Sequence, residues 1–203
     1  MSALFSIPTT PLIAQLKRQE GFRAVPYLCT ARACTIGYGT NLQAHPQYIP
    51  YPDLECAARS GRLKGLLLRN ALRARGMRWN EEEAATALHE EVNACKRQLA
   101  ARCPEFVRLA EIGEVPRAEV LLNMAFNMGV DGLLRFKNTL AMLRAAISDA
   151  VAIRNAADAA NGCREDHASY ARVADGMLNS LWANQVGRRA DELARQMRTG
   201  AYL

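Results

Sequence analysis

The sequence predicts a mostly helical α+β fold, with β structure confined to about residues 26 to 42. Two observations carry this prediction. Apolar residues recur at helical spacing along most of the chain. Gly37, Tyr38 and Gly39 are instead typical of a hairpin that runs close to another segment. Half of the 203 residues are hydrophobic, so one domain with a sizeable core is expected.

The first predicted helix ends at Glu20. Leu12, Ile13, Leu16 and Glu20 fall on roughly one face when they are placed at helical spacing. The carboxyl group of Glu20 would then stand at a helix end that faces the predicted turn. This position makes it a candidate for the wall of a cleft.

The middle of the chain is predicted to be a loop followed by helices. Residues 44–55 are rich in proline and are interpreted as loop. Residues 62–76 alternate basic residues with leucine, so we expect a helix there. This helix could attach to an anionic membrane or to a wall polymer. The favoured interpretation is that it is a solvated cover packed by its leucines. Asn80 is a good N-cap for the three glutamates after it, and that helix should run towards Ala101.

The C-terminal part is predicted to be helical as well. Pro116 fits the start of a helix, and Gly129 and Gly132 are expected to bracket a turn. Further helices are predicted over residues 136–160, which Asn161-Gly162 ends, and over residues 165–181 and 183–199.

Composition narrows the possible partners. The chain has 26 Lys and Arg against 20 Asp and Glu, and the net charge of +6 favours anionic partners. Aromatic residues make up only 6% and no nucleic-acid recognition motif is present, so we expect no nucleic-acid partner. Pro8 and Pro11 interrupt an N-terminal segment without early positive charge, which argues against a signal peptide. No run approaches the ~18 apolar residues needed to span a bilayer, so no integral membrane segment is expected.

The six cysteines and three histidines are scattered. Without a C-x-x-C pair or ligand-spaced histidines, the sequence predicts no metal site, and each histidine is interpreted as exposed or hydrogen-bonded. Cys34 follows Cys29 by five residues, so a hairpin could bring their Cα atoms within the ~4.4 to 6.8 Å that a disulfide requires. The favoured interpretation is that Cys34 is a small buried apolar residue.

The stretch from Glu20 to Asn41 resembles a known family, the phage lysozymes of the T-even type, which are glycoside hydrolases that cut bacterial peptidoglycan. In that family a Glu-Gly pair is followed by Tyr seven residues after the Glu, Asp nine after it, Thr fifteen after it, and then Ile-Gly-x-Gly. This chain has Glu20-Gly21, Tyr27, Cys29, Thr35 and Ile36-Gly37-Tyr38-Gly39. Every position fits except Cys29, where the usual member carries Asp.

The resemblance resumes downstream, in Leu121 to Leu143, in Trp182 to Gln185, and in Arg189-Ala190. It implies a two-lobed lysozyme: a small lobe over residues 19–80, with the hairpin and a cleft wall, and a helical lobe over 81–203. The helix over residues 9–20 would pack with the helical lobe. Relative to the family, the segment over residues 41–79 is about a dozen residues longer, and the resemblance implies nothing for it.

The resemblance also implies roles for particular residues. Glu20 would be the acid that protonates the leaving oxygen, and Thr35 the hydroxyl that positions water. Arg189 matches an arginine near the catalytic Glu and would position the acid. Three further residues match positions near the cleft floor and would bind substrate, with a core polar network as the alternative: Asn127, Trp182 and Gln185.

Cys29 occupies the position of the residue that holds the attacking water. A thiol with a pKa near 8.5 is only about a few per cent thiolate at neutral pH. Three outcomes are open: the thiolate acts as base or nucleophile, the thiol orients water with Thr35, or the site is inactive. We favour activity.

The expected function is therefore that of an endolysin that hydrolyses the β-1,4 bond between N-acetylmuramic acid and N-acetylglucosamine. A lytic transglycosylase acting on the same bond, and an inactive wall-binding module, are the alternatives. Peptidoglycan is the expected partner of a monomer that needs no cofactor. The protein would accumulate in the host cytoplasm and reach the wall after a holin permeabilises the membrane.

Overall fold

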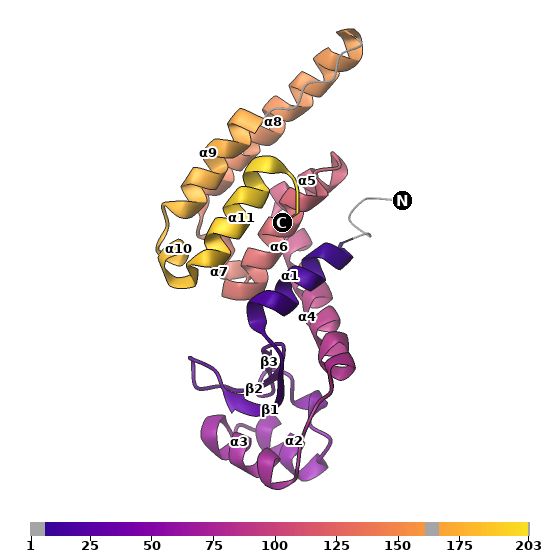
Figure 1. Ribbon diagram of the computed structural model, residues 1–203, viewed down its shortest axis with the longest axis vertical. Coiled ribbons are helices and arrows are strands. Elements are labelled where there is room, and N and C mark those ends of the chain that lie inside the picture. The colour runs from indigo at the N-terminus through magenta and orange to yellow at the C-terminus, as the bar shows by residue number, and fades with distance from the viewer. Residues whose placement is uncertain (1–6, 161–166, 203) are drawn as a thin grey trace. The chain divides into compact units, whose positions relative to one another are not determined.

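The computed structural model describes residues 7–160 and 167–202 (Figure 1). Most of this part is helical, and it contains a three-stranded antiparallel sheet in the order β1-β2-β3. The predicted α+β class is confirmed. None of the helices in the described ranges is both long and apolar enough to cross a membrane.

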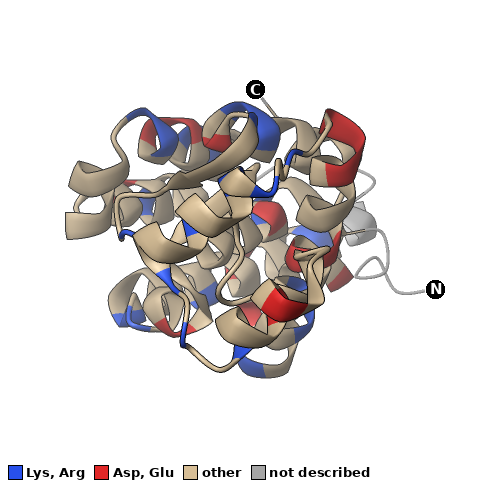
Figure 2. Ribbon diagram, turned by 90° about the horizontal axis from the view of Figure 1, so that it is seen from below, with Lys and Arg blue, Asp and Glu red and all other residues tan. Residues whose placement is uncertain are grey.

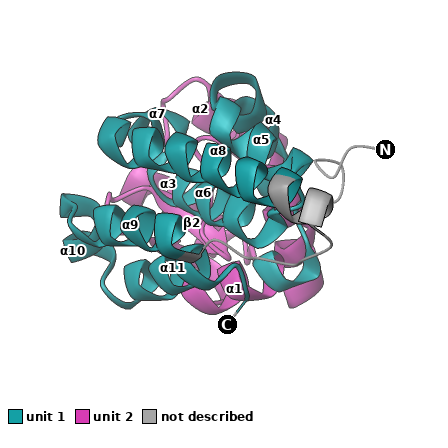
Figure 3. Cartoon of the chain, turned by 90° about the horizontal axis from the view of Figure 1, so that it is seen from above, with its two compact units in different colours: residues 1–12, 92–203 teal, residues 13–91 magenta. Residues whose placement is uncertain are grey.

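The chain forms two compact units (Figure 3). One, called here the mixed unit, is Ile13–Glu91, and the other, called the helical unit, is Met1–Leu12 together with Val92–Leu203. The boundaries fall inside two helices, α1 (Thr10–Glu20) and α4 (Glu81–Arg102), so each of these helices contributes residues to both units. Basic and acidic residues occur on helices throughout the chain (Figure 2).

The sheet of the mixed unit consists of β1 (Arg23–Leu28), β2 (Cys34–Gly37) and the short β3 (Thr40–Asn41). In the β1–β2 pair Leu28 lies opposite Cys34 and Tyr27 lies opposite Thr35, and the register shifts between Arg23 and Tyr27. Side chains alternate between the faces of a strand. Cys34 and Leu28 therefore share one face of the hairpin, and Thr35 and Tyr27 share the other.

A hydrophobic core packs against the face of the sheet that carries Cys34. This core draws on β2, on the 3₁₀ helix η2 (Pro46–Tyr48), and on the helices α2 (Pro52–Arg59) and α3 (Gly65–Ala74). Its buried members are Cys34, Ile36, Leu42, Ile49, Leu54, Ala58, Leu68, Leu72 and Met77. Residues 42–77, which include η2, α2 and α3, thus supply most of the hydrophobic support of the sheet.

The prediction that residues 44–55 form a loop is wrong. The proline-rich stretch contains η2, and α2 begins at Pro52 behind an extended N-cap, Tyr51. Proline is favourable at the first position of a helix because its missing N–H would have no partner there. Leu54 of α2 is buried in the core, and the proline content of the segment gave no indication of this helix.

The start of α4 agrees with its prediction. The backbone N–H of Glu83 donates to Oδ1 of Asn80 at 2.8 Å, and the backbone N–H of Asn80 donates to Oε2 of Glu83 at 2.7 Å. This reciprocal pair is a capping box, which satisfies two backbone donors at once.

The helical unit continues with α5 (Pro104–Glu111), α6 (Val115–Met128), α7 (Val130–Leu134), α8 (Lys137–Ala160), α9 (His167–Leu178), α10 (Leu181–Val186) and α11 (Arg188–Thr199). Helices α8 and α9 run side by side as a hairpin, and α9 also packs on α11 (Figure 1). The predicted helix over residues 136–160 is confirmed, whereas the break at Asn161-Gly162 lies outside the described residues.

Two predictions for the C-terminal part are wrong in detail. The helix expected over residues 183–199 is divided at Gly187, whose φ of 51° and ψ of −121° are not helical. Gly132 does not bound a turn but lies inside α7. A glycine does not by itself reveal whether it breaks a helix or lies within one, because it tolerates both conformations.

Buried charged groups fasten the helical unit. The Arg117 side chain donates from Nε to the carbonyl of Met197 at 2.8 Å, pairs with Glu114, and lies 3.9 Å from the ring centroid of Tyr170. The Glu119 carboxylate accepts from the backbone N–H and the hydroxyl of Thr9, at 2.6 and 2.8 Å, and from the hydroxyl of Tyr202. The first and last described segments of the chain are thereby joined.

Candidate active site

Glu20 is the last residue of α1, at the negative end of the helix dipole. The helix stops at Gly21, which has a φ of 69° and whose N–H donates to the carbonyl of Lys17 at 3.1 Å. This left-handed conformation is one that glycine adopts without steric cost. The sequence Glu-Gly therefore places a carboxyl group at a sharp exit from a helix, as predicted.

Gly39 leaves space for the carboxyl group of Glu20. A Cβ atom built at Gly39 would lie 3.3 Å from Oε2 of Glu20, and the φ of Gly39 is 91°. Any side chain here would both strain the backbone and press on the carboxyl oxygen. Gly39 is therefore explained by the neighbouring Glu20 as well as by the turn.

Cys29 and Thr35 meet at the turn end of the β1–β2 hairpin. The backbone N–H of Cys29 donates to the carbonyl of Ala33 at 3.1 Å, and the turn between them passes through Arg32 with a φ of 59°. The Thr35 hydroxyl lies 3.0 Å from the Ala33 carbonyl oxygen and also within hydrogen-bond reach of the Cys29 thiol. Its single hydrogen serves one of the two at a time.

The turn favours the thiolate form of Cys29. Burial alone would raise the pKa of this thiol, but hydrogen bonds from backbone groups of Ala33 and Ala31 and from the Thr35 hydroxyl outweigh burial and hold the pKa below its usual value. Hydrogen bonds to the charged form stabilise it. The loop thus helps to ionise the group that is predicted to direct water.

Tyr27 lies within electrostatic reach of both Glu20 and Cys29. Burial raises the pKa of the Tyr27 phenol, Arg23 opposes the rise, and the negative charges of Glu20 and Cys29 both add to it. The Arg23 guanidinium lies 4.4 Å from the ring centroid of Tyr27. All three predicted catalytic residues, Glu20, Cys29 and Thr35, therefore belong to one neighbourhood of the mixed unit.

Cys34 is not part of this neighbourhood. It is completely buried in the core behind the sheet, and burial raises the pKa of its thiol to about 11. The five cysteines that the structure describes are all free thiols, and Cys163 lies outside the described residues. The preferred interpretation of Cys34 as a small buried apolar residue is confirmed.

Glu91 is a site residue that sequence reasoning missed. It accepts a hydrogen bond from the buried hydroxyl of Thr40, while its Oε1 has no hydrogen-bond partner within the described part of the chain. Burial raises the pKa of this carboxyl, Thr40 and His45 oppose the rise, and the charges of Glu20 and Glu90 add to it. A second carboxyl group thus lies within electrostatic reach of Glu20.

No signal in the sequence separates Glu91 from its neighbours. Glu90 precedes it on the same helix, and the Glu90 carboxylate is exposed and accepts from the Tyr48 hydroxyl at 2.5 Å. Adjacent glutamates on a long helix are usually solvated. Glu91 differs from Glu90 in its burial and in its hydrogen bond from Thr40, which belongs to β3.

Two of the predicted substrate-binding residues, and the predicted acid-positioning Arg189, are held by side-chain hydrogen bonds in the helical unit. Nε1 of Trp182 donates to Oδ1 of Asn127 at 2.9 Å, and the Gln185 side chain is exposed. Arg189 donates from Nε and Nη2 to Oδ1 of the buried Asn123, at 3.0 and 2.8 Å. The structure therefore links Trp182 with Asn127 and holds Arg189 by an amide, while substrate binding and acid positioning stay predictions.

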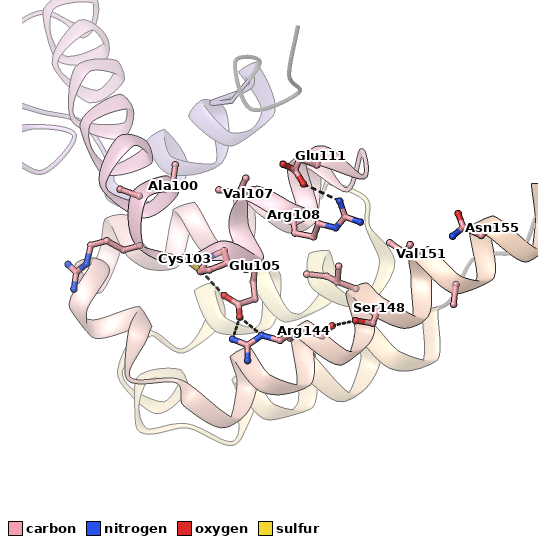
Figure 4. A pocket seen from close by; sticks show the side chains of 15 residues that line it. Ala100, Cys103, Glu105, Val107, Arg108, Glu111, Arg144, Ser148, Val151 and Asn155 are labelled. Carbon is pink, nitrogen blue, oxygen red and sulfur yellow. Dashed lines mark hydrogen bonds and ion pairs between the residues drawn. The ribbon is translucent and has the colours of Figure 1, made fainter.

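A pocket of about 890 Å³ lies in the helical unit between the C-terminal end of α4, α5 and α8 (Figure 4). None of the predicted site residues lines it. Its acidic side chains are engaged: Glu105 by Arg144 at 2.5 and 3.0 Å, and Glu111 by Arg108 at 3.1 Å. Acid catalysis is therefore not assigned to this pocket. The described residues contain no group of three or more His, Cys, Asp or Glu side chains arranged to hold a metal ion.

Replacing Glu91 with Gln is expected to raise the melting temperature near neutral pH. The folded-state pKa of Glu91 is raised, so its contribution to stability is present at low pH and is lost as the pH rises through that pKa. Glutamine keeps an acceptor for Thr40 and carries no charge. The gain should shrink as the pH falls towards about 4, where Glu91 itself becomes protonated.

Thermal unfolding of both proteins, followed by circular dichroism across this pH range, measures the difference. The exposed Glu82→Gln variant on the same helix is the control and should show no such trend. An equal gain at both ends of the pH range would contradict a raised pKa of Glu91.

Comparison with known proteins adds the family. A family model described as phage lysozyme matches residues 17–192, which is most of the chain and includes every residue predicted for the site. No curated protein matches the chain. The mostly helical α+β architecture with a small antiparallel sheet is that of a lysozyme-like fold. The chain belongs to the phage lysozyme family.

Proposed function

We propose that this protein is an endolysin of the T-even type that hydrolyses the β-1,4 bond between N-acetylmuramic acid and N-acetylglucosamine in peptidoglycan. The observation that carries the proposal is the neighbourhood of Glu20, Cys29 and Thr35 around one hairpin. Family membership supports a hydrolase that degrades peptidoglycan. The residues supply the two groups that glycosidic hydrolysis needs, an acid and a group that directs water.

Glu20 is the acid in this proposal. Its carboxyl group donates a proton to the glycosidic oxygen as the bond to the anomeric carbon breaks. Gly39 keeps the space beside Oε2 open, so a sugar oxygen can approach it. The Glu91 carboxyl, held by Thr40 close to Glu20, adds negative charge to this neighbourhood when ionised.

Cys29 and Thr35 direct the water. The Cys29 thiolate takes a proton from a water molecule while the water oxygen bonds to the anomeric carbon, and the Thr35 hydroxyl orients that water. The proton lost by Glu20 goes to the leaving sugar, and the proton lost by water goes to sulfur, so the charges balance. The lowered pKa of the thiol supports this role, because a base must be ionised at the working pH.

Polar residues of the helical unit are proposed to bind the substrate and to position the acid. Asn127, Trp182 and Gln185 would bind the N-acetyl and peptide groups of the substrate through amide and indole groups. Arg189 would position the acid, with its guanidinium oriented by Asn123. The protein would act as a monomer, would accumulate in the host cytoplasm, and would depend on a holin to reach the wall.

One observation favours a second candidate. Cysteine stands where the family carries the carboxylate that directs water, and a lytic transglycosylase works with a single Glu. In that reaction the muramic hydroxyl, instead of water, would attack the anomeric carbon. A wall-binding module without activity would also retain the fold.

Glu20→Gln is expected to lower the rate of wall lysis by about 10²- to 10⁴-fold, because the amide cannot transfer a proton. Clearing of permeabilised cells, followed as turbidity, measures the rate, and circular dichroism verifies folding. Glu82→Gln, which removes an exposed carboxyl group of the same unit, is the matched control and should clear cells at the wild-type rate. Lysis by Glu20→Gln within tenfold of wild type would rule out Glu20 as the acid.

Cys29 should react with iodoacetamide with a midpoint pH below that of an unperturbed cysteine in a short peptide alkylated in parallel, because the pKa of its thiol is lowered. Alkylation and loss of lysis should proceed at the same rate. Cys56 is exposed, so the measurement uses a chain with Cys56→Ser and Cys163→Ser, while Cys34, Cys95 and Cys103 have pKa values raised to about 11 by burial.

Substitutions complete this measurement of Cys29. Cys29→Asp should preserve lysis because it restores an ionised group, and Cys29→Ser should lose about 10²-fold or more because its hydroxyl does not ionise. Full activity of the alkylated protein or of Cys29→Ser would exclude Cys29 as the base.

The products distinguish the remaining candidates. Digested peptidoglycan should contain reducing N-acetylmuramic ends, which mass spectrometry separates from anhydro-muropeptides by the mass of one water. Anhydro products would instead establish the transglycosylase reaction. Sedimentation with purified walls in the absence of any soluble product would establish a binding module.

A further inference from the structure

Helix α3 buries one face and leaves leucines exposed on the other. Leu68 and Leu72 are fully buried in the core behind the sheet. Leu66 is 50% exposed and Leu67 is 63% exposed. Among the described residues, Leu181 is the one other large hydrophobic side chain that is exposed to this degree. Two adjacent exposed leucines need an explanation beyond the folding of this unit.

The positive charge of the protein is concentrated around these leucines. Residues 56–80 contain seven Lys and Arg and no Asp or Glu. The remaining 178 residues contain 19 basic and 20 acidic residues, so they contribute a charge of −1 to the total of +6. The segment that contains α3 therefore accounts for the basic character of the whole chain.

Five of these cations have no carboxylate partner within the described part of the chain: Arg62, Lys64, Arg69, Arg73 and Arg78. Arg62 donates from Nε to Oγ of Ser60, and Arg73 donates from Nε to the carbonyl of Pro26 at 2.7 Å. In contrast, Arg59 pairs with Glu55 and Arg75 pairs with Asp53. The α3 patch is defined as the two exposed leucines and the four of these cations that fall within residues 62–73: Arg62, Lys64, Leu66, Leu67, Arg69 and Arg73.

The composition of the α3 patch identifies its partner. Cations attract any anionic polymer, but exposed leucines gain free energy only where an apolar phase receives them. A wall polymer of sugars, peptides and phosphates offers no such phase, whereas the headgroup region of a bilayer does. We propose that the α3 patch docks the protein on a bilayer that contains anionic phospholipid, with both leucines inserted at the level of the headgroups.

The two components should contribute separately. Each Lys or Arg near an anionic bilayer strengthens binding by about fivefold, an effect that salt screens. The leucines, half-exposed in the free protein, strengthen binding by their burial and are insensitive to salt. The proposal adds a second surface to the protein and does not depend on the reaction at Glu20.

Flotation with phosphatidylglycerol–phosphatidylcholine vesicles tests the proposal. Wild type should bind these vesicles at low ionic strength and should not bind pure phosphatidylcholine. The affinity of the Leu66→Ser/Leu67→Ser variant for these vesicles should be lower than that of wild type by about tenfold or more. The Arg62→Gln/Arg69→Gln variant should lose about 25-fold and show a shallower dependence on salt. Hydrolysis of soluble wall fragments should be unchanged in both variants.

Two matched controls lie outside the α3 patch. Leu181→Ser removes a leucine that is 82% exposed, and Arg108→Gln removes an arginine that is paired with Glu111. Both should bind vesicles as wild type does. Leu67→Trp adds a reporter that keeps the patch apolar, and its fluorescence should shift to the blue when anionic vesicles are added. It tests insertion even if a serine variant fails to fold.

Several results would overturn the proposal. Wild type could fail to bind anionic vesicles, or could bind neutral vesicles equally well. Wild type could instead bind purified walls and not vesicles. If that binding falls in the arginine variant and not in the leucine variant, the partner is a wall polymer. A wild-type dimer that becomes a monomer in the leucine variant would assign the leucines to self-association.

Discussion

The alternation of side chains along β2 is the constraint on which the candidate site depends. Cys34 and Ile36 belong to the core behind the sheet, so Thr35, between them, must lie on the other face, opposite Tyr27. A shift of one residue in the register would bury Thr35 in the core and expose both apolar residues. The hydrophobic core formed with α2 and α3 thus determines which hydroxyl faces Cys29.

The surroundings of Cys29 favour the ionised form of its thiol. A carboxylate is ionised at neutral pH without assistance, whereas a thiol needs an environment that favours the anion. The turn from Cys29 to Ala33 provides it, through backbone hydrogen bonds and the hydroxyl of Thr35. Cys34 has the same side chain five residues later, and burial raises its pKa to about 11. The two thiols differ because one faces a turn and the other faces a core.

Local signals predicted from the sequence agree with the structure, and signals that depend on tertiary packing were missed. The end of α1 at Glu20 and the capping box at Asn80 follow from adjacent residues. The helix that begins at Pro52 depends on the core that receives Leu54, which the residue pattern does not specify. In the sequence, Glu91 cannot be distinguished from a solvated glutamate. Its burial and its hydrogen bond from Thr40 of β3 arise only in the folded structure. The gathering of Glu20, Cys29 and Thr35 was expected from the resemblance of residues 20–41 to the phage lysozyme motif.

The hydrogen bonds of Thr9 have a consequence for the order of events during synthesis. Its partner Glu119 lies 110 positions later in the chain, and Tyr202, which shares that carboxylate, lies 193 positions later. The mixed unit, by contrast, is one uninterrupted segment, Ile13–Glu91. A ribosome-bound chain can therefore form the hairpin and its core early. Thr9, in the segment that ends at Leu12, forms its hydrogen bonds only after Glu119 and Tyr202 have been synthesised. The unit that carries the proposed acid and base is free to fold first, and the contacts of Thr9 in the helical unit are completed only after synthesis has passed Tyr202.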